Sequence, residues 1–118
     1  MKWVDFVSPH SITEAVELLS NANGEARILA GGTDLLVQIR ADRLQTDLIV
    51  DGKNIPELNS ISFDSRSGLT IGAAVPCYQI YGNKDVQDNY PGLIDSTSLI
   101  GGTQIQGRAT LGGNLCNA

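Results

Sequence analysis

The sequence predicts an α+β fold, in which a small α/β part is followed by part of an antiparallel α+β unit. Helical periodicity alternates with short apolar runs as far as residue 50, whereas β-like alternation begins near residue 60. A length of 118 residues corresponds to one small domain. The change in character near residue 55 divides it into expected subdomains of residues 1–55 and 56–118.

The first predicted helix starts at Ser11, where the sequence Ser-Ile-Thr-Glu matches a capping box. In this motif the Ser11 side chain accepts from the amide of Glu14, and the Glu14 side chain accepts from the amide of Ser11. Apolar residues then recur at helical spacing, and Asn23-Gly24 predicts a left-handed stop. We expect this helix to contribute packing and no chemistry. Its apolar face comprises Ile12, Ala15, Val16, Leu19 and Ala22.

Two short apolar runs, 27–30 and 48–50, predict buried strands on either side of a short helix over 33–40. The first run ends abruptly at Gly31-Gly32, which predicts a glycine turn between strand and helix. Strand, helix and strand form a parallel unit, because parallel strands need a crossover connection. In open α/β sheets, ligands bind at the carboxyl ends of the strands, which is where this turn lies.

The chain becomes more β-like after Pro56. A weak strand is predicted over 61–63, and residues 69–73 alternate as a half-buried strand does. The last segment, 109–115, is predicted to begin as a strand and to run into a glycine turn.

Prolines mark the starts of two further helices in the second half. Pro76 and Pro91 suit the first position of a helix, and they predict helices over 77–81 and 92–100. The intervening segment, 82–89, is polar and is predicted to be a surface loop.

Composition excludes several classes of function. Eight Lys and Arg against 13 Asp and Glu give a net charge of −5, which is the wrong sign for wrapping a nucleic-acid backbone. No run approaches the roughly 18 apolar residues of a membrane span, and no signal peptide is recognisable, so we expect a cytoplasmic protein.

Cys77 and Cys116 are expected to be free thiols, and the single histidine, His10, is expected on the surface. No metal site and no catalytic residue are predicted.

Glycine is concentrated in two segments, because 7 of the 13 glycines lie at 31–32 and within 101–113. A backbone without β-carbons can approach a ligand closely, and its amides can then hold a phosphate or pyrophosphate. A tight turn without a ligand is the alternative, and the residues leave both open. Known phosphate fingerprints do not fit: G-x-G-x-x-G is absent, and Arg108-Ala109 stands where a P-loop needs Lys and Ser or Thr. The pattern therefore favours a cofactor binder over a hydrolase.

Two motifs resemble the FAD-binding medium subunit of molybdenum hydroxylases, a family that includes the flavin subunits or domains of xanthine dehydrogenase and aerobic carbon monoxide dehydrogenase. The first motif is Arg-Ile-Leu-Ala-Gly-Gly-Thr-Asp-Leu-Leu at 27–36, and the second covers 104–118 and contains Ala-Thr-Leu-Gly-Gly-Asn. The resemblance spans nearly the whole chain. It implies an FAD-binding fold of the PCMH and vanillyl-alcohol oxidase type, of which the chain holds an incomplete part.

The resemblance also implies which residues bind FAD. By the family pattern the first loop, residues 29–35, wraps the pyrophosphate, chiefly through amides. The second loop, residues 100–114, closes over the phosphates and the flavin side, with Thr110 and Asn114 as side-chain donors. Asp34 would repel phosphate if it faced inward, so we expect it to point away and brace the turn. Two further positions stand out: Gln106-Gly107 replaces a common Arg-Asn pair, and Cys116 is interpreted as a packing residue. The implied cofactor-binding residues are Leu29, Ala30, Gly31, Gly32, Thr33, Asp34, Leu35, Ile100, Gly101, Ala109, Thr110, Gly113 and Asn114.

In function, the resemblance implies an FAD-dependent oxidoreductase subunit, or an N-terminal fragment of one, that passes electrons from iron–sulfur clusters to an external acceptor. Its partners would be a molybdopterin-containing large subunit and a 2Fe-2S small subunit, and the fragment alone is expected to be inactive. One alternative is a truncated binding or assembly module that has lost FAD and self-associates through an incomplete sheet edge. Another is a flavin oxidase of the same fold that acts without molybdenum partners.

Overall fold

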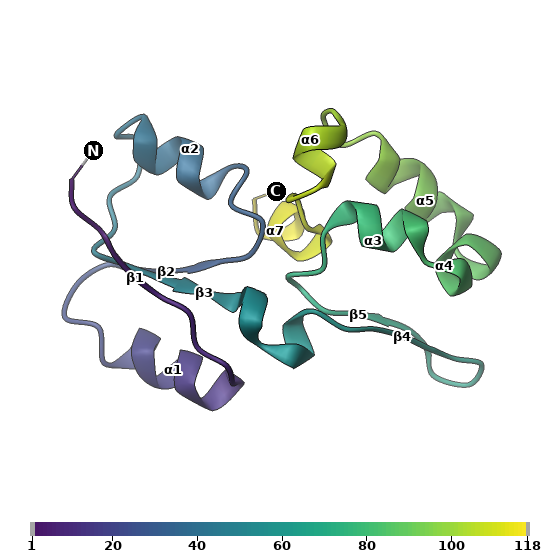
Figure 1. Cartoon of the computed structure of the whole chain (residues 1–118), viewed down its shortest axis with the longest axis horizontal. Coiled ribbons are helices and arrows are strands. Elements are labelled where there is room, and N and C mark those ends of the chain that lie inside the picture. The colour runs from purple at the N-terminus through teal and green to yellow at the C-terminus, as the bar shows by residue number, and fades with distance from the viewer. Residues whose placement is uncertain (1, 118) are drawn as a thin grey trace.

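The fold consists of two small sheets with helices packed around them, arranged in an elongated molecule of 45 × 31 × 20 Å (Figure 1). It was obtained as a computed structural model that describes residues 2–117; Met1 and Ala118, the outer ends of the two predicted subdomains, lie outside the described residues. In order, the elements are β1 (Asp5–Val7), α1 (Ile12–Ser20), β2 (Ala26–Leu29), α2 (Leu35–Arg40), β3 (Leu48–Asp51), the 3-10 turns η1 (Gly52–Asn54) and η2 (Pro56–Leu58), β4 (Ile61–Asp64), β5 (Gly68–Ile71), α3 (Cys77–Gly82), α4 (Lys84–Asn89), α5 (Pro91–Ser98), α6 (Thr103–Gln106) and α7 (Leu111–Asn117).

The first sheet is parallel and has the order β1-β3-β2. Ile49 in the central strand lies opposite Phe6 of β1 and Arg27 of β2, so both neighbours run parallel to it. The predicted strand–helix–strand unit is therefore confirmed as β2, α2 and β3. The strand β1 was not predicted, because three residues, of which Asp5 and Phe6 are exposed, carry too little apolar pattern. All three carboxyl ends lie at one edge of this sheet.

Helices α1 and α2 cover opposite faces of the parallel sheet, as Figure 1 shows. Adjacent residues of a strand point to opposite faces, so Val50 and Ile49 enter different cores. Val50 packs with Ala15 of α1, whereas Ile49 packs with Ile39 of α2. Helix α1, the parallel sheet and helix α2 thus form a three-layer unit, and the connecting loops lie at the ends of the strands.

The N-terminus of α1 is capped nearly as predicted. The Oγ of Ser11 accepts from the amide of Glu14 at 3.1 Å, but the Glu14 carboxylate accepts from the amide of His10, at 2.9 Å, and not from that of Ser11. The helix ends at Ser20 and not at residues 23–24: Asn21 is its C-cap, and the Ser20 hydroxyl donates back to the carbonyls of Val16 and Glu17 in the last turn.

The second sheet is an antiparallel hairpin of β4 and β5, in which Ile61 lies opposite Ile71. Both strands were predicted, although β5 ends two residues earlier than expected. Helices α3, α4 and α5 lie on one side of the hairpin (Figure 1). Their shared core contains Val75, Ile80 and Val86, each of which is fully buried.

The predicted loop over 82–89 is wrong, because residues 84–89 form α4. The side-chain oxygen of Asn83 accepts from the amide of Val86 at 3.2 Å and so caps the helix. Val86 is the only apolar residue of this helix, and burying it fixes the helix against α3 and α5. A single apolar position gives no helical period that could be recognised in the sequence.

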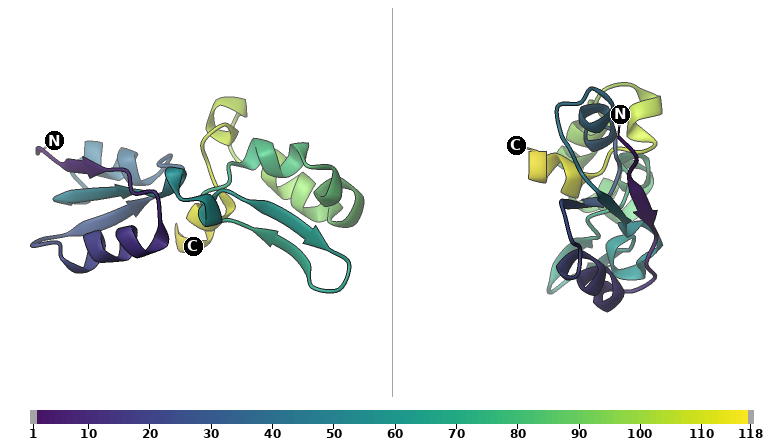
Figure 2. Two further views of the ribbon diagram at one scale, coloured as in Figure 1. Left: turned by 60° about the horizontal axis from the view of Figure 1, so that its bottom comes forward. Right: turned by 90° about the vertical axis from the view of Figure 1, so that its left-hand side faces the viewer.

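The predicted strand and glycine turn over 109–115 are also wrong. Thr110 makes only an isolated bridge with Pro76, and the chain then enters α7. Gly112 lies so close to Ala73 that an added β-carbon would be 2.6 Å from the Ala73 carbonyl oxygen. This glycine therefore permits tight helix packing. Figure 2 shows that α7 lies between the two sheets.

Candidate functional site

The first glycine loop follows the carboxyl end of β2 and leads into α2. Gly32 has φ +78, in the left-handed region that favours glycine. Within residues 2–117, the amides of 31–35 donate to no protein acceptor. Consecutive free amides in a turn form a concavity suited to an anion. The geometry of this loop therefore fits a phosphate group.

The second motif touches the first loop directly. Gly31 lies against the backbone of the second motif, where an added β-carbon would be 2.9 Å from the Arg108 carbonyl carbon and 3.1 Å from the Ala109 Cα. Ala109 is almost fully buried, and its carbonyl accepts from the amide of Cys77 at 2.8 Å. Two motifs far apart in the sequence are thus joined at Gly31.

Asp34 braces the first loop from two sides. Its carboxylate accepts from the Gln38 side-chain amide at 2.6 Å, and also from the side-chain amide of Asn117. The first bond runs along α2 and the second links α2 to α7. The sequence predicted that Asp34 braces the turn and points away from a phosphate. The two bonds give its carboxylate partners in α2 and α7, and its direction relative to a phosphate stays a prediction.

The second loop is organised by Thr110. Its buried Oγ accepts from the amide of Gly113 at 2.9 Å, and its carbonyl accepts from the side-chain amide of Asn114 at 2.9 Å. Both predicted side-chain donors are therefore engaged in the first turn of α7, where they shape the loop. Donation by either residue to FAD stays a prediction.

Other predicted site residues take different places. Leu29 and Leu35 belong to the core beneath α2, so their side chains face the protein and only their backbone can serve a ligand. Ile100 and Gly101 lie before α6, where Gly101 has φ +56, and among the described residues no recorded hydrogen bond joins them to the first loop.

Two interpretations of the second motif change with the structure. Gln106 is buried, and its side-chain amide donates to the Ser98 carbonyl at 2.8 Å, so this residue fastens α6 to the end of α5. Cys116 is exposed, so its interpretation as a packing residue is wrong. Cys116 and the buried Cys77 are both free thiols, as predicted, and His10 is exposed.

A polar cluster that the sequence did not reveal lies at the carboxyl edge of the parallel sheet. Asp51, at the end of β3, accepts from the Ser8 hydroxyl at 3.3 Å, from the Lys53 amide at 3.1 Å and from the Lys53 ammonium at 2.5 Å. Burial raises the pKa of the Asp51 carboxyl, but the bonds from Lys53 and Ser8 lower it by more. The resulting pKa lies below the ordinary value of an Asp carboxyl. The Lys53 ammonium also reaches the Ala30 carbonyl, at 3.5 Å.

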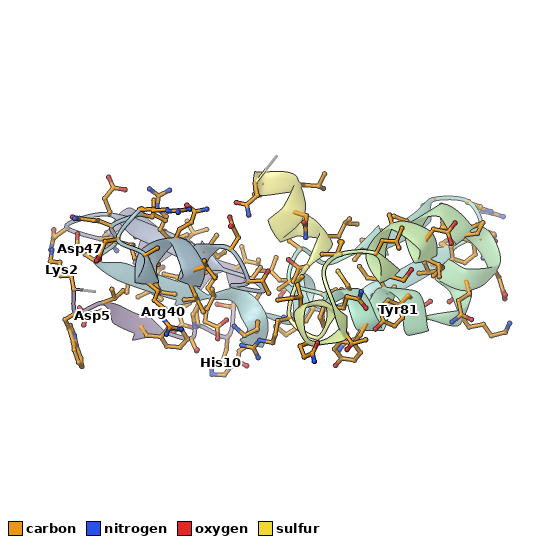
Figure 3. All side chains as sticks on the ribbon, turned by 90° about the horizontal axis from the view of Figure 1, so that it is seen from above. Lys2, Asp5, His10, Arg40, Asp47 and Tyr81 are labelled. Atoms are coloured by element: carbon orange, nitrogen blue, oxygen red, sulfur yellow. The ribbon has the colours of Figure 1, made fainter. Side chains whose placement is uncertain are left out.

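A hollow of about 560 Å³ lies at the opposite edge of the same sheet and is lined by carboxylates, including Asp5, Glu14, Glu17 and Asp47. Asp47 pairs with Lys2 at 3.0 Å, and Figure 3 shows Lys2, Asp5 and Asp47 together at one end of the molecule, away from α7. Carboxylates repel a phosphate. The two loops, and not this hollow, are therefore the candidate anion site.

In residues 2–117 no cluster of three or more His, Cys, Asp or Glu side chains could hold a metal ion. The same part of the chain has no helix whose length and apolar character would let it cross a membrane.

Comparison with known sequences gives matches along nearly the whole chain. Residues 2–118 match the family described as the FAD binding domain in molybdopterin dehydrogenase. The xanthine dehydrogenase FAD-binding subunit of Escherichia coli O157:H7 is 38% identical over 116 residues, which cover 96% of this chain and 39% of that protein. The carbon monoxide dehydrogenase medium chain of Hydrogenophaga pseudoflava is 32% identical over 113 residues, with the same coverage.

Solved structures match equally well. A carbon monoxide dehydrogenase from Hydrogenophaga pseudoflava that lacks the Mo-pyranopterin moiety superposes with a TM-score of 0.91 at 32% identity, over 97% of this chain and 39% of that one. Quinoline 2-oxidoreductase from Pseudomonas putida 86 gives a TM-score of 0.90 at 29% identity, over 98% and 40% of the two chains. The sequence thus spans 39% of the length of the curated relatives described above. As its two glycine motifs implied, the chain belongs to the family of FAD-binding domains of molybdopterin dehydrogenases.

Proposed function

We propose that the two joined loops hold the pyrophosphate of FAD, and that the chain thereby forms the phosphate-binding part of a flavin site. One observation carries the proposal: the free amides of 31–35 lie beside the second loop, which contacts the first at Gly31. The cofactor-binding residues of this site are the predicted ones, with the side chains of Leu29 and Leu35 directed to the core.

The chain's own groups account for how a dianionic ligand is held on a protein of net charge −5. Backbone amides donate to the phosphate oxygens without adding a charge. The Asp34 carboxylate is bonded to Gln38 and Asn117, which partly offsets its repulsion of the phosphates. Bound FAD would supply the redox chemistry, while the protein supplies binding and orientation.

We further propose that this site serves an FAD-binding subunit that takes electrons from iron–sulfur clusters and passes them to an external acceptor. The names of the relatives support this role, because they are called FAD-binding subunits or medium chains of dehydrogenases. The proposed partners are a molybdopterin-containing large subunit and a 2Fe-2S small subunit. We also place the subdomain boundary at residue 55, where the fully buried Ile55 closes the core beneath α1.

Competition between FAD and its fragments tests the site most specifically. The protein is titrated with FAD, and binding is followed by flavin absorbance and fluorescence, alone and with excess ADP or riboflavin. Because the loops contact the pyrophosphate, we expect ADP to displace FAD and riboflavin to compete weakly. Stronger competition by riboflavin than by ADP would move the site to the flavin ring. An absence of FAD binding, together with self-association in sedimentation, would favour the assembly module.

A further inference from the structure

We propose that Lys53 is a positioning residue of the FAD site: its ammonium holds the carbonyl of Ala30 and thereby orients the Ala30–Gly31 peptide at the start of the first loop. This inference rests on the proposed function. It adds a residue that lies outside both glycine motifs, on the turn that follows β3.

The contacts of Lys53 define this role. Its ammonium donates to Asp51 at 2.5 Å and to the Ala30 carbonyl at 3.5 Å, so it bridges the ends of two adjacent parallel strands. Asp51 is itself fixed by the hydroxyl of Ser8, which follows β1. The cluster of Ser8, Asp51 and Lys53 therefore spans all three carboxyl ends, the edge at which open α/β sheets bind ligands.

Holding the Ala30 carbonyl also sets the direction of the next amide. In a trans peptide the C=O and N–H bonds point in opposite directions, so the Gly31 N–H points away from Lys53. A cation on the carbonyl also polarises the peptide, which makes its N–H a stronger donor. Lys53 thus both aims and strengthens the first of the free amides.

The burial of this ion pair distinguishes it from the other ion pairs of residues 2–117. The side chains of Lys53 and Asp51 are 29% and 10% exposed, whereas the most enclosed of the other pairs, Arg27 with Glu25, is 43% and 69% exposed. Removing charges from water costs free energy that their attraction often fails to recover. Stability alone is therefore a weak explanation for this pair, and the contact of Lys53 with the Ala30 carbonyl supplies another.

The test compares FAD affinity in four variants of the full chain. Lys53→Met removes the anchor and should weaken FAD binding by up to about tenfold, because the Ala30–Gly31 peptide must then be ordered when FAD binds. Lys53→Arg keeps the cation and should restore most of the affinity. Lys84→Met breaks an exposed pair with Asp88 on α4 and should leave the affinity unchanged.

The fourth variant separates positioning from general stability. Asp51→Asn combined with Lys53→Met removes both charges, and Asn still caps the following turn. The double variant should therefore unfold at a higher urea concentration than Lys53→Met, yet bind FAD as weakly. Recovery of FAD affinity in the double variant, or wild-type affinity in Lys53→Met, would overturn the proposal.

A second readout does not depend on FAD. The amide proton shift of Gly31 in the ligand-free protein should move in Lys53→Met and stay in place in Lys84→Met. If the wild-type protein binds no FAD, the proposed function fails while this shift still tests the anchor. An unmoved Gly31 shift would contradict the anchoring role whatever FAD does.

Discussion

Gly31 and Gly32 are glycines for two different physical reasons. Gly31 has no room for a β-carbon because the Arg108 backbone lies against it, and Gly32 has a φ of +78 that other residues rarely adopt. The sequence suggested that both leave room for a phosphate. The structure shows instead that a β-carbon on Gly32 would meet the side chains of Leu29 and Leu36, at 2.9 and 3.0 Å.

Gly31→Ala should consequently push the two loops apart. We expect a loss of about 1–3 kcal/mol in the free energy of unfolding, as for other overpacked sites, together with weaker FAD binding. Gly92→Ala is the matched control, because nothing lies within 4 Å of its added β-carbon on α5. Urea unfolding and FAD titration measure both effects. Equal stability and affinity in the two variants would contradict the contact between the loops.

Asp51 should contribute to stability in a pH-dependent way. Its pKa in the folded protein is lowered from the value of 3.8 that it has in the unfolded chain. Its contribution is therefore fully present above pH 3.8 and is lost as the pH falls through the lower folded pKa. Asp51→Asn should lose less stability than the wild type between pH 4 and pH 2. Parallel pH profiles of the unfolding free energy would show that Asp51 gains no such stabilisation from Lys53.

At the scale of elements, α7 is the one that shapes the second loop. Thr110 caps its first turn, and Gly112 lets it pack against Ala73. The residues Thr-Leu-Gly-Gly-Asn read as a strand and turn, since two glycines disfavour a helix. Tertiary contact reverses that preference, because α7 packs so closely against Ala73 that a β-carbon at position 112 would lie 2.6 Å from the Ala73 carbonyl oxygen.

Two helix caps offer a matched pair of variants. Thr110→Val removes the α7 cap, and Asn83→Ala removes the α4 cap; each should cost about 1 kcal/mol in the free energy of unfolding. Only Thr110→Val should also weaken FAD binding, since α4 lies away from the loops. Calorimetric unfolding and FAD titration distinguish the two effects. Similar FAD affinities in both variants would remove the α7 cap from the site.

How far the sequence predicts an element depends on how many residues carry its pattern. Helix α1, with nine residues, shows a full apolar stripe and a capping box, and it was predicted with an error only at its end. Helices α4 and α6, with six and four residues, were missed because each has a single apolar position. The strands β2, β3, β4 and β5 were all found, since apolar runs and alternation need few residues.

At the scale of the whole molecule, the candidate site lies where the parallel-sheet unit meets the hairpin unit. The radius of gyration is 15.3 Å, above the roughly 13.5 Å expected of a compact domain of this length. The chain is elongated because the core around the parallel sheet and the core around the hairpin lie side by side, with α7 between them (Figure 2). A ligand held by both loops would therefore also join the two halves.

This arrangement explains which parts of the site the sequence could predict. The two loops were recognised because each is a contiguous motif, which can be identified from the sequence without knowledge of the fold. The contacts of Gly31 with Arg108, of Asp34 with Asn117 and of Lys53 with Ala30 were not, because each joins segments that only folding brings together.

The central claim is that both loops bind one pyrophosphate, and an amide shift titration tests it most directly. The ¹⁵N-labelled protein is titrated with ADP, and the chemical shift of each backbone amide is followed. We expect the largest changes at residues 31–35 and at Thr110, Gly113 and Asn114, with little change at Asp5 and Asp47 in the acidic hollow. Shifts confined to that hollow, or to only one of the two loops, would contradict the claim.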